Sequence, residues 1–383
     1  MAEKRKDSKG RVLKTGESER ADGRYQYRFT QHGKRYTLYA NTLKELREKE
    51  DELQTALTLR MDYIKGKMTV GDLCDKYMQQ KENIKPSTKH TYNHRLNAIR
   101  KDPISQLSIA DVTTSDVKEW CIRQSRTYVY DTVRKRLATL RSAFDVALGD
   151  RAVYSNPCNF ELKSVITYQK QKQISLNDTE IEVFLHEIQS NPYSARYYRL
   201  ILVLLHTGIR IGECLGLTVD DIDFENRMLN IDKQSVRFGT HHHITTPKTT
   251  SSCRNVPLDD TALQALKEEI AFHPPLNKVI DGHSGFIFHN DMDILRDTVI
   301  IVAIRNVIKR YNATRKSNDI LLPPITPHTL RHTFCTHMIE HEMSPIALQQ
   351  IMGHSDARIT LETYTHPSQE WAFSKFYDAS EDT

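Results

Sequence analysis

The chain has 383 residues, of which 38% are hydrophobic, and its formal net charge is +5 at pH 7. This length suffices for two or three domains, but the longest apolar run, residues 200–205, is far shorter than the roughly 20 residues that a membrane-spanning helix needs. We expect no secretory signal in the polar N-terminal segment, and six scattered cysteines without a Cys-x-x-Cys pair are typical of a reduced, cytoplasmic protein.

The first predicted element is a β-hairpin in residues 24–40. Residues 34–40 form its second strand after a turn at His32-Gly33, with Tyr36 and Leu38 on the apolar side. The first strand, residues 24–30, alternates in polarity, so that aromatic side chains face one way and polar ones the other. The two faces are Tyr25, Tyr27 and Phe29 against Arg24, Gln26 and Arg28.

A short strand near residues 11–14 and a helix from residue 41 to about residue 59 would complete a small module, residues 1–67, with three strands against one helix. Residues 1–40 contain eleven Lys/Arg and five Asp/Glu, an excess of six positive charges. Such a sheet can enter the major groove of DNA, where Arg and Gln reach base edges. The same pattern fits the solvated face of an ordinary hairpin equally well.

Residues 68–160 predict a helical region. Thr69 is expected to cap its first helix, Ser87 to open the next, and Thr114 or Ser115 to open a third. The longest helix is expected at about residues 128–148, with one apolar stripe made of Val133, Leu137, Leu140, Phe144 and Leu148. Several cations lie off the expected core, and scattered Lys/Arg usually mark a solvated surface: Lys89, Arg95, Arg134, Lys135, Arg136 and Arg141.

Ser-Asn-Pro at residues 155–157 interrupts the helical pattern, and the polar, basic stretch up to about residue 172 predicts a linker. A second helical region begins at residues 175–177. Within it, Thr207-Gly208 ends a helix at residues 197–206, and Arg210 and Glu213 follow in the segment TGIRIGE. Taken alone, Arg210 and Glu213 would be an ordinary surface ion pair, which contributes little.

Residues 227–258 predict three short strands with turns. Lys248 lies in the Thr/Ser-rich turn PKTTSS, where a lysine is usually just solvated. The three histidines at residues 241–243 raise the possibility of a metal site. We favour the tip of a hairpin loop, because neither helical spacing nor a nearby pair of carboxylates supports a closed site.

Residues 325–366 have the most informative spacing. His328 and Arg331 are three residues apart and would share one face of a helix, whose buried face is Leu330, Phe334 and Met338. A short helix should follow, with Ser344 as cap, Pro345 in the first turn and Gly353 at the end. His354 and Tyr364 come next. Imidazoles, a guanidinium and a phenol suit an anionic oxygen that is held while a hydroxyl attacks. His332 lies four residues after His328, but Arg331 between them would oppose a metal cation.

These segments resemble the tyrosine recombinase family. The family signature comprises T-G-x-R-x-x-E, here residues 207–213, then HTLRH at 328–332, GHS at 353–355, and a tyrosine with a following histidine at 364–366. One H-x-x-R motif occurs by chance, but the full set in the right order is specific. Cys214 occupies a position where the family usually has an aliphatic residue, which alters packing only.

The resemblance implies roles for individual residues. Tyr364 would attack a DNA phosphodiester and form a 3′-phosphotyrosyl link, Lys248 would protonate the leaving 5′ oxygen, and Glu213 would orient the site. Arg210, Arg331 and His354 would hold phosphate oxygens, while His328 would act either as proton acceptor or as hydrogen-bond donor. The implied catalytic set is Arg210, Lys248, His328, Arg331, His354 and Tyr364. We expect no metal and no cofactor.

The implied fold class is multidomain, with a small β-sheet-plus-helix module, an all-α domain and a mainly α (α+β) catalytic domain. Residues 1–67 resemble the arm-type DNA-binding domain of conjugative-transposon integrases, residues 68–160 would be the core-binding domain, 161–174 the linker, and 175–383 the catalytic domain with its C-terminal tail. Candidate DNA-contacting residues are Arg20, Arg24, Gln26, Arg28, Arg35, Lys89, Arg95, Arg134 and Arg141.

The expected partners are double-stranded DNA of the element ends and target, further copies of the chain in a homotetramer, and excision and host DNA-bending proteins in a bacterial, nucleoid-associated setting. No membrane partner is expected. Two other functions fit part of the pattern. A type IB topoisomerase has the same nucleophile, but the N-terminal module favours recombination. A non-catalytic DNA-binding regulator would have lost a catalytic residue, whereas every expected position is filled.

Overall fold

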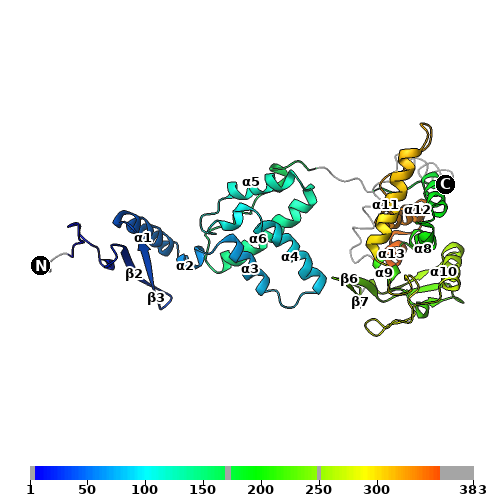
Figure 1. Ribbon diagram of the computed structural model, residues 1–383, viewed down its shortest axis with the longest axis horizontal. Helices are drawn as coiled ribbons and strands as arrows, with labels where there is room; N and C mark the ends of the chain where they lie inside the picture. Colours follow the sequence, from blue (N-terminus) through cyan, green and yellow to red (C-terminus); the bar gives the residue numbers. More distant parts are fainter. Residues whose placement is uncertain (1–4, 169–173, 248–251, 354–383) are drawn as a thin grey trace, which may run out of the picture. The chain divides into compact units, whose positions relative to one another are not determined.

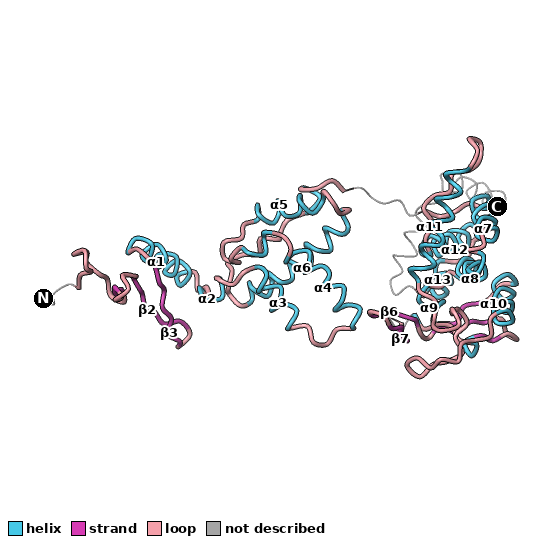
Figure 2. Tube along the Cα trace, viewed as in Figure 1, coloured by secondary structure: helices cyan, strands magenta, loops and turns pink. Residues whose placement is uncertain are grey.

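The computed structural model describes residues 5–168, 174–247 and 252–353. They divide into two compact units, Met1–Lys170 and Gln171–Thr383. Figures 1 and 2 show a small sheet and a group of helices in the first unit, and helices with short strands in the second. Within the described residues, no helix is both long and apolar enough to cross a membrane.

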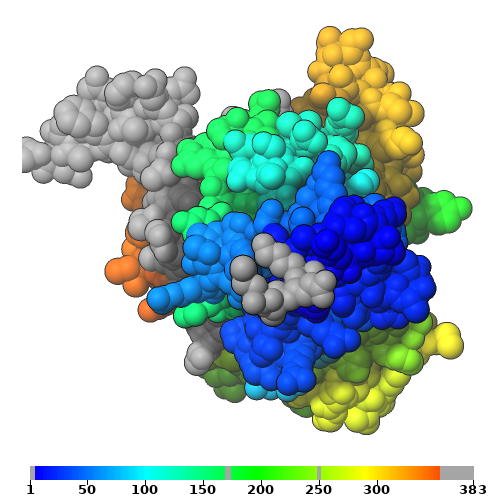
Figure 3. Space-filling view, turned by 90° about the vertical axis from the view of Figure 1, so that its left-hand side faces the viewer, coloured from blue at the N-terminus to red at the C-terminus, as the bar shows by residue number. Residues whose placement is uncertain are grey.

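The N-terminal module is an antiparallel sheet against one helix. Its sheet has the order β1-β2-β3, formed by β1 (Glu17–Glu19), β2 (Tyr25–Gln31) and β3 (Lys34–Ala40). Tyr27 pairs with Leu38 and Phe29 with Tyr36, which confirms the predicted hairpin and its apolar face. Helix α1 (Leu43–Thr58) begins after Thr42, whose hydroxyl accepts the Glu45 N–H at 3.1 Å. Figure 3 shows this module in dark blue, facing the viewer.

The strand predicted near residues 11–14 is wrong. The third strand is β1, because the preceding segment folds back on itself around Asp7. The Asp7 carboxylate accepts the backbone N–H of Arg11 at 2.7 Å and pairs with the Arg11 Nε at 2.8 Å. Residues 7–11 are thereby held in a tight turn, and pairing with β2 starts only at Glu17.

The rest of the first unit is helical, as predicted. Thr69 caps α3 (Val70–Gln79) and Thr113 caps α5 (Thr114–Ser125), each in a reciprocal capping box. Helix α4 (Pro86–Arg100) begins one residue before Ser87, because proline is favoured in the first turn. Helix α2 (Tyr63–Gly66) precedes them, and α6 (Tyr130–Gly149) is the longest of the unit's described helices.

Helix α6 has most of the predicted apolar stripe, but two of its residues differ from the prediction. Val133, Leu137, Leu140 and Phe144 are buried, but Leu148 lies in the last turn and is 39% exposed. Arg136 was expected on the surface and is only 2% exposed. Its guanidinium lies over the Tyr128 ring, 3.7 Å from the centroid, and hydrogen-bonds to Gln124, which explains how the charge is tolerated there.

Helix α2 packs against the helical part of the unit. The Gly66 carbonyl accepts the Ala110 N–H at 3.1 Å, and a Cβ at Gly66 would lie 3.0 Å from the Ala152 carbonyl oxygen. The Asp62 N–H donates to the Arg151 carbonyl at 2.8 Å. Residues 62–66 therefore hydrogen-bond to the helical part of the unit, while Tyr63 also contacts Phe29 of the module.

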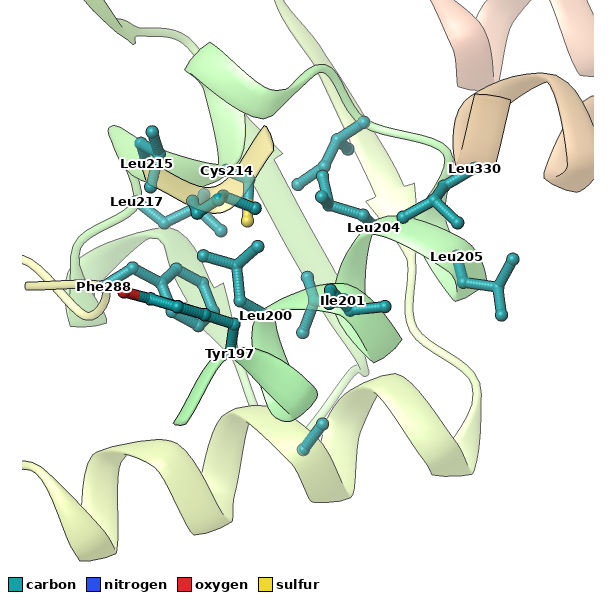
Figure 4. Packing of buried hydrophobic residues seen from close by; sticks show 14 of the residues in the cluster. Tyr197, Leu200, Ile201, Leu204, Leu205, Cys214, Leu215, Leu217, Phe288 and Leu330 are labelled. Carbon is teal, nitrogen blue, oxygen red and sulfur yellow. The ribbon is translucent and has the colours of Figure 1, made fainter. Parts of the chain in front are cut away.

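The second unit is built around α8 (Tyr198–Thr207), which packs on α10 (Asp260–Phe272) and α12 (Pro327–Glu340). Figure 4 shows Leu200, Leu204 and Leu330 within the apolar cluster that surrounds α8. The described part of the unit also contains the α-helices α7 (Asp178–Ser190), α9 (Ile211–Leu215), α11 (Asp297–Thr314) and α13 (Pro345–Met352). Cys214 is completely buried in the same cluster, which agrees with the packing role expected from the sequence.

The strands of this unit form two small sheets in its described part. One has the order β4-β5-β8, from β4 (Ile222–Asp223), β5 (Met228–Ile231) and β8 (Arg254–Pro257). The other is the hairpin β6 (Gln234–Phe238) and β7 (His241–Thr245). The described part of residues 227–258 therefore contains four strands instead of the predicted three.

The prediction that residues 241–243 form a loop tip is also wrong. The turn is made by residues 239–240, where Gly239 has φ 59°, so His241 already pairs with Phe238. His242 is 8% exposed and its Nδ1 lies 3.0 Å from the Ser235 hydroxyl. The turn is thus complete before His241, and His241 and His242 already belong to strand β7.

Candidate active site

A glycine turn places the first predicted catalytic residue. Helix α8 ends at Gly208, which has φ 63° in the left-handed region. A Cβ at Gly208 would lie 2.4 Å from the Phe334 ring, so only glycine fits. The chain then turns into α9 with Arg210 as its N-cap. The sequence predicted this helix end correctly.

Glu213 is held between two guanidinium groups. Arg210 donates its backbone N–H to Oε2 at 3.0 Å and its Nη1 to Oε1 at 2.6 Å, while Arg254 Nη2 donates to Oε2 at 3.0 Å. The Glu213 side chain is 1% exposed. Burial raises the pKa of its carboxyl, but the charges and hydrogen bonds of Arg254 and then Arg210 outweigh burial and hold that pKa below its usual value. An ionised, fixed carboxylate suits orientation of the arginines better than proton transfer.

Arg331 lies on α12, which begins after the capping residue Thr326. It is 4% exposed, and it donates Nη1 to the Gly208 carbonyl and Nη2 to the Met352 carbonyl, both at 2.6 Å. Burial, and next the positive charge of Arg210, lower the pKa of Arg331 to about 9. Arg331 therefore keeps its charge at neutral pH although the residue is almost completely buried.

The C-terminal end of α13 brings the arginines together. In the described chain, three successive carbonyls there accept from three different arginines. The Ile351 carbonyl accepts from Arg254 Nε at 2.5 Å. The next carbonyl, that of Met352, accepts from Arg331, and the Gly353 carbonyl accepts from Arg210 Nη2 at 3.4 Å. The last carbonyls of a helix lack intrahelical partners and carry partial negative charge, so cations are favoured there. Helix α13 begins after Ser344 and ends at Gly353 (φ 62°), as predicted.

Two imidazoles flank this cluster. His328 is exposed in the first turn of α12, and its ring centroid lies 6.1 Å from that of His332, one turn later. The surrounding protein lowers the pKa of His328 by desolvation, and the charges of Arg331 and Arg210 lower it further. The pKa of His332 is lowered by desolvation and then by His328. Both rings are thus neutral at neutral pH, a state in which His328 can accept a proton or donate a hydrogen bond.

The structure brings Arg210, Glu213, His328 and Arg331 into one site. Lys248, His354 and Tyr364 lie outside the described residues. Lys233, which directly precedes β6, is buried and ion-paired with Asp221.

Arg254 belongs to this site, although it is absent from the catalytic set that the family resemblance implied. The available signal was the Arg-x-x-Pro-Leu pattern at residues 254–258, which follows the Lys248 turn. That signal does not distinguish a buried arginine from a solvated one.

The candidate DNA-contacting residues of the module differ in solvent exposure and in whether their side chains already bind other groups of the protein. Arg28 and Arg35 are exposed, and Arg28 lies on the sheet face opposite Tyr27 and Phe29. Gln26 is buried and donates to the Ser18 hydroxyl at 2.9 Å, so its amide is engaged within the sheet. Arg20 and Arg24 both ion-pair with the same exposed carboxylate, that of Asp22.

The candidate DNA-contacting residues of the helical region also differ in exposure and in their protein partners. Lys89 is exposed, Arg95 lies 5.7 Å from the Tyr92 ring centroid, and Arg134 is exposed beside Asp131. Arg141 donates Nη2 to the carbonyls of Cys158 and Phe160, at 2.9 and 3.1 Å. Its guanidinium thus fixes the segment that follows α6, which favours a structural role for Arg141 over DNA contact.

Comparison with known proteins identifies the class. A model of the phage integrase family matches residues 175–370, and a model of the DNA-binding domain of Tn916 integrase matches residues 1–57. The transposase from transposon Tn916 of Enterococcus faecalis is 37% identical over 393 aligned positions, which cover 98% of this chain and 96% of that protein.

Solved structures agree. Tn1549 integrase in complex with a circular intermediate DNA matches with a TM-score of 0.75 and 31% identity, over 81% of this chain and 99% of that one. A lambda integrase tetramer bound to a Holliday junction shares the fold, with a TM-score of 0.57 and 17% identity over 92% of this chain and 95% of that one.

A small sheet module, a helical unit and a buried arginine site on this scaffold define a tyrosine recombinase. The chain belongs to the phage integrase family, and its activity is site-specific recombination of a mobile element. The family and the fold class expected from the sequence motifs are both confirmed.

Proposed function

We propose that this recombinase cuts and rejoins double-stranded DNA at the ends of its element through a covalent link to Tyr364, with Arg210 and Arg331 binding the scissile phosphate. The observation that carries the proposal is the meeting of these arginines at the end of α13, directly before His354 in the chain.

The arginines suit a phosphate for two reasons. Planar guanidinium forks match the geometry of non-bridging oxygens and remain charged at neutral pH. Positive charge that is already fixed by the Gly208 and Met352 carbonyls needs little reorganisation when charge develops on the phosphate. Arg210, with a side chain 35% exposed, offers a surface to the DNA, and Arg331 adds charge from a drier position.

The chemistry is a phosphoryl transfer without a metal or ATP. The Tyr364 oxygen attacks phosphorus, the bond to the 5′ oxygen breaks, and a 3′-phosphotyrosyl link forms. Lys248 gives a proton to the leaving 5′ oxygen, and His354 binds a phosphate oxygen. A tyrosine with a usual pKa near ~10 must lose its proton or have its anion stabilised, and neutral His328 can serve as acceptor or as hydrogen-bond donor. A 5′ hydroxyl from another strand then reverses the step.

Two relatives support a proposed assembly. Tn1549 integrase is bound to DNA in its solved structures, and lambda integrase forms a tetramer on a Holliday junction. We extend both to this chain: residues 1–67 bind arm sites, residues 68–160 and 175–383 enclose the core site across the linker at 161–174, and four copies exchange strands. Excision and host DNA-bending proteins at the bacterial nucleoid would set the direction of the reaction.

Covalent trapping tests this function. The protein is incubated with a nicked duplex from the element end, without metal or ATP, and adducts are resolved on a denaturing gel. Wild type should give an adduct, Tyr364→Phe should give none while still binding DNA, and Tyr377→Phe, the matched control, should behave as wild type. Retained trapping in Tyr364→Phe would overturn the nucleophile assignment.

A second assay separates the other functions. Strand exchange between two element ends supports recombination, whereas relaxation of supercoiled plasmid without exchange would identify a topoisomerase. Binding without any adduct from wild type would identify a regulator.

A further inference from the structure

We propose that Arg254 is a positioning residue of the recombination site, which fastens strand β8 to Glu213 and to the end of α13 and thereby holds Arg210 in place. The inference rests on the proposed function, because it assigns a role in the cleavage step.

All three guanidinium nitrogens of Arg254 have protein acceptors. Nε donates to the Ile351 carbonyl at 2.5 Å, Nη1 to the Ser252 carbonyl at 2.9 Å, and Nη2 to the Glu213 carboxylate at 3.0 Å. Its side chain is 6% exposed. Because Nε, Nη1 and Nη2 each already donate to a protein acceptor, one of them the Glu213 carboxylate, we assign Arg254 to the positioning of other site residues rather than to the substrate.

Arg254 reaches Arg210 through one shared carboxylate. Glu213 accepts from Arg254 on Oε2 and from the Arg210 side chain on Oε1. Glu213 is buried, so loss of Arg254 would leave its carboxylate with one counter-charge in place of two. The carboxylate would then either draw Arg210 inward or take up a proton, and both change the position of Arg210.

The Arg254 side chain also lies close to Gly353, the residue before His354. A Cβ placed on Gly353 would lie 3.0 Å from Arg254 Cδ and 3.1 Å from its Nε and Nη1. Gly353 is thus the residue that lets the end of α13 approach this side chain. Arg254 is also the first residue of β8, six residues after Lys248 in the sequence.

Arginine suits this position better than lysine. Its fork reaches two carbonyls and a carboxylate in three directions, while one ammonium on a flexible stem can keep only the ion pair with Glu213. The two substitutions Arg254→Met and Arg254→Lys therefore separate the parts of the role. Arg227→Met is the matched control, because Arg227 adjoins the same sheet and forms only an exposed ion pair with Asp260.

The experiment measures single-turnover cleavage of the nicked duplex, DNA affinity and the thermal unfolding midpoint of the full chain, over pH 5 to 9. Arg254→Met should bind DNA within about threefold of wild type and cleave about 100-fold more slowly, the size of effect that small misplacements in a site produce. As the pH is lowered, the cleavage rate of Arg254→Met should begin to fall at a higher pH than the rate of wild type. The reason is that Glu213 loses its main counter-charge, so the pKa of Glu213 rises. Arg254→Lys should restore the wild-type pH dependence and only part of the rate.

A wild-type cleavage rate in either variant would overturn the inference. So would a parallel loss of binding and cleavage with an unshifted pH profile, which indicates a merely structural arginine. If Arg254→Met does not fold, Arg254→Lys decides: slower cleavage with wild-type DNA affinity supports the inference, and a wild-type rate or a parallel loss of binding overturns it. Failure of the proposed function looks different, because wild type and Arg227→Met would then form no adduct either.

Discussion

The N-terminal module and the catalytic unit of this recombinase differ in how their candidate DNA-contacting and catalytic arginines are placed. In the N-terminal module, Arg28 and Arg35 are exposed. In the catalytic unit, Arg331 is 4% exposed and the side chain of Arg254 is 6% exposed, and both donate to backbone carbonyls. Burial of a guanidinium costs free energy unless its donors are satisfied. Exposed arginines suit salt-sensitive DNA affinity, and buried, oriented ones suit catalysis.

Burial alone does not mark the site. Arg136 in the first unit is 2% exposed, but its partners are the Tyr128 ring and Gln124 on neighbouring elements. What distinguishes the catalytic unit is convergence, since arginines from separate segments meet at the end of one helix. Substitutions in each unit can therefore test whether the two groups of arginines have different roles.

The largest effect is expected for Arg331→Met. Methionine fills most of the volume but removes the fixed charge, so single-turnover cleavage should fall about 100- to 1000-fold or more, with DNA binding much less affected. The exposed Arg305→Met on α11 is the control and should cleave as wild type. Cleavage within tenfold of wild type in Arg331→Met would mean that this buried charge is not catalytic.

Deletion of residues 1–60 should remove binding to arm-site DNA and leave cleavage of core sites within a few-fold of wild type. Deletion of residues 1–67 should in addition lower the unfolding midpoint, because residues 62–66 hydrogen-bond to the helices at Ala110 and Arg151. Gel-shift assays on the two DNA sites and thermal unfolding measure both effects. Unchanged arm-site binding would remove the role assigned to the module.

A smaller effect is expected for Arg28→Gln. If the exposed arginine neutralises one phosphate, the slope of log K against log salt for arm DNA should decrease in magnitude by about 1. Lys44 is exposed on α1, and Lys44→Gln is the control, which should leave the slope unchanged. An unchanged slope would leave Arg28 a solvated surface residue.

The smallest effect concerns Glu50, which is 6% exposed on α1 near Glu17. Burial, and then the charge of Glu17, raise the pKa of Glu50 to about 7 from a usual 4.5, against the opposing charges of Lys14 and Arg47. The folded module therefore binds a proton that the unfolded chain has released, and its stability should fall as pH rises from about 4.5 through 7.

The unfolding midpoint of the module should accordingly be higher at pH 5 than at pH 8, and Glu50→Gln should remove most of this difference. Glu48→Gln on the exposed side of α1 should not. A wild-type midpoint that does not change over this range would contradict the assignment.

Local signals explain what the sequence predicted well. Thr69 and Ser344 as caps, and Gly208 and Gly353 as helix ends, depend on hydrogen bonds and backbone angles within a few residues. These ends also position Arg210 and the last carbonyls of α13, so much of the site followed from the sequence.

Long-range pairing explains what it missed. Strand β1 has three residues and is defined by its pairing with β2, while a local turn at Asp7 displaced the strand predicted earlier in the chain. Arg254 has partners 41 and 97 residues away, at Glu213 and Ile351. Neither the burial of Arg254 nor the shared carboxylate leaves a pattern in the neighbouring sequence.

The most direct test of the arginine site compares two substrates for one variant. A methylphosphonate at the scissile position lacks one negatively charged oxygen, so it should need less compensating positive charge. If Arg331 neutralises the phosphate, Arg331→Met should cleave the methylphosphonate far better, relative to wild type, than it cleaves the phosphodiester. Equal loss on both substrates would contradict the account and leave Arg331 as a brace between Gly208 and Met352.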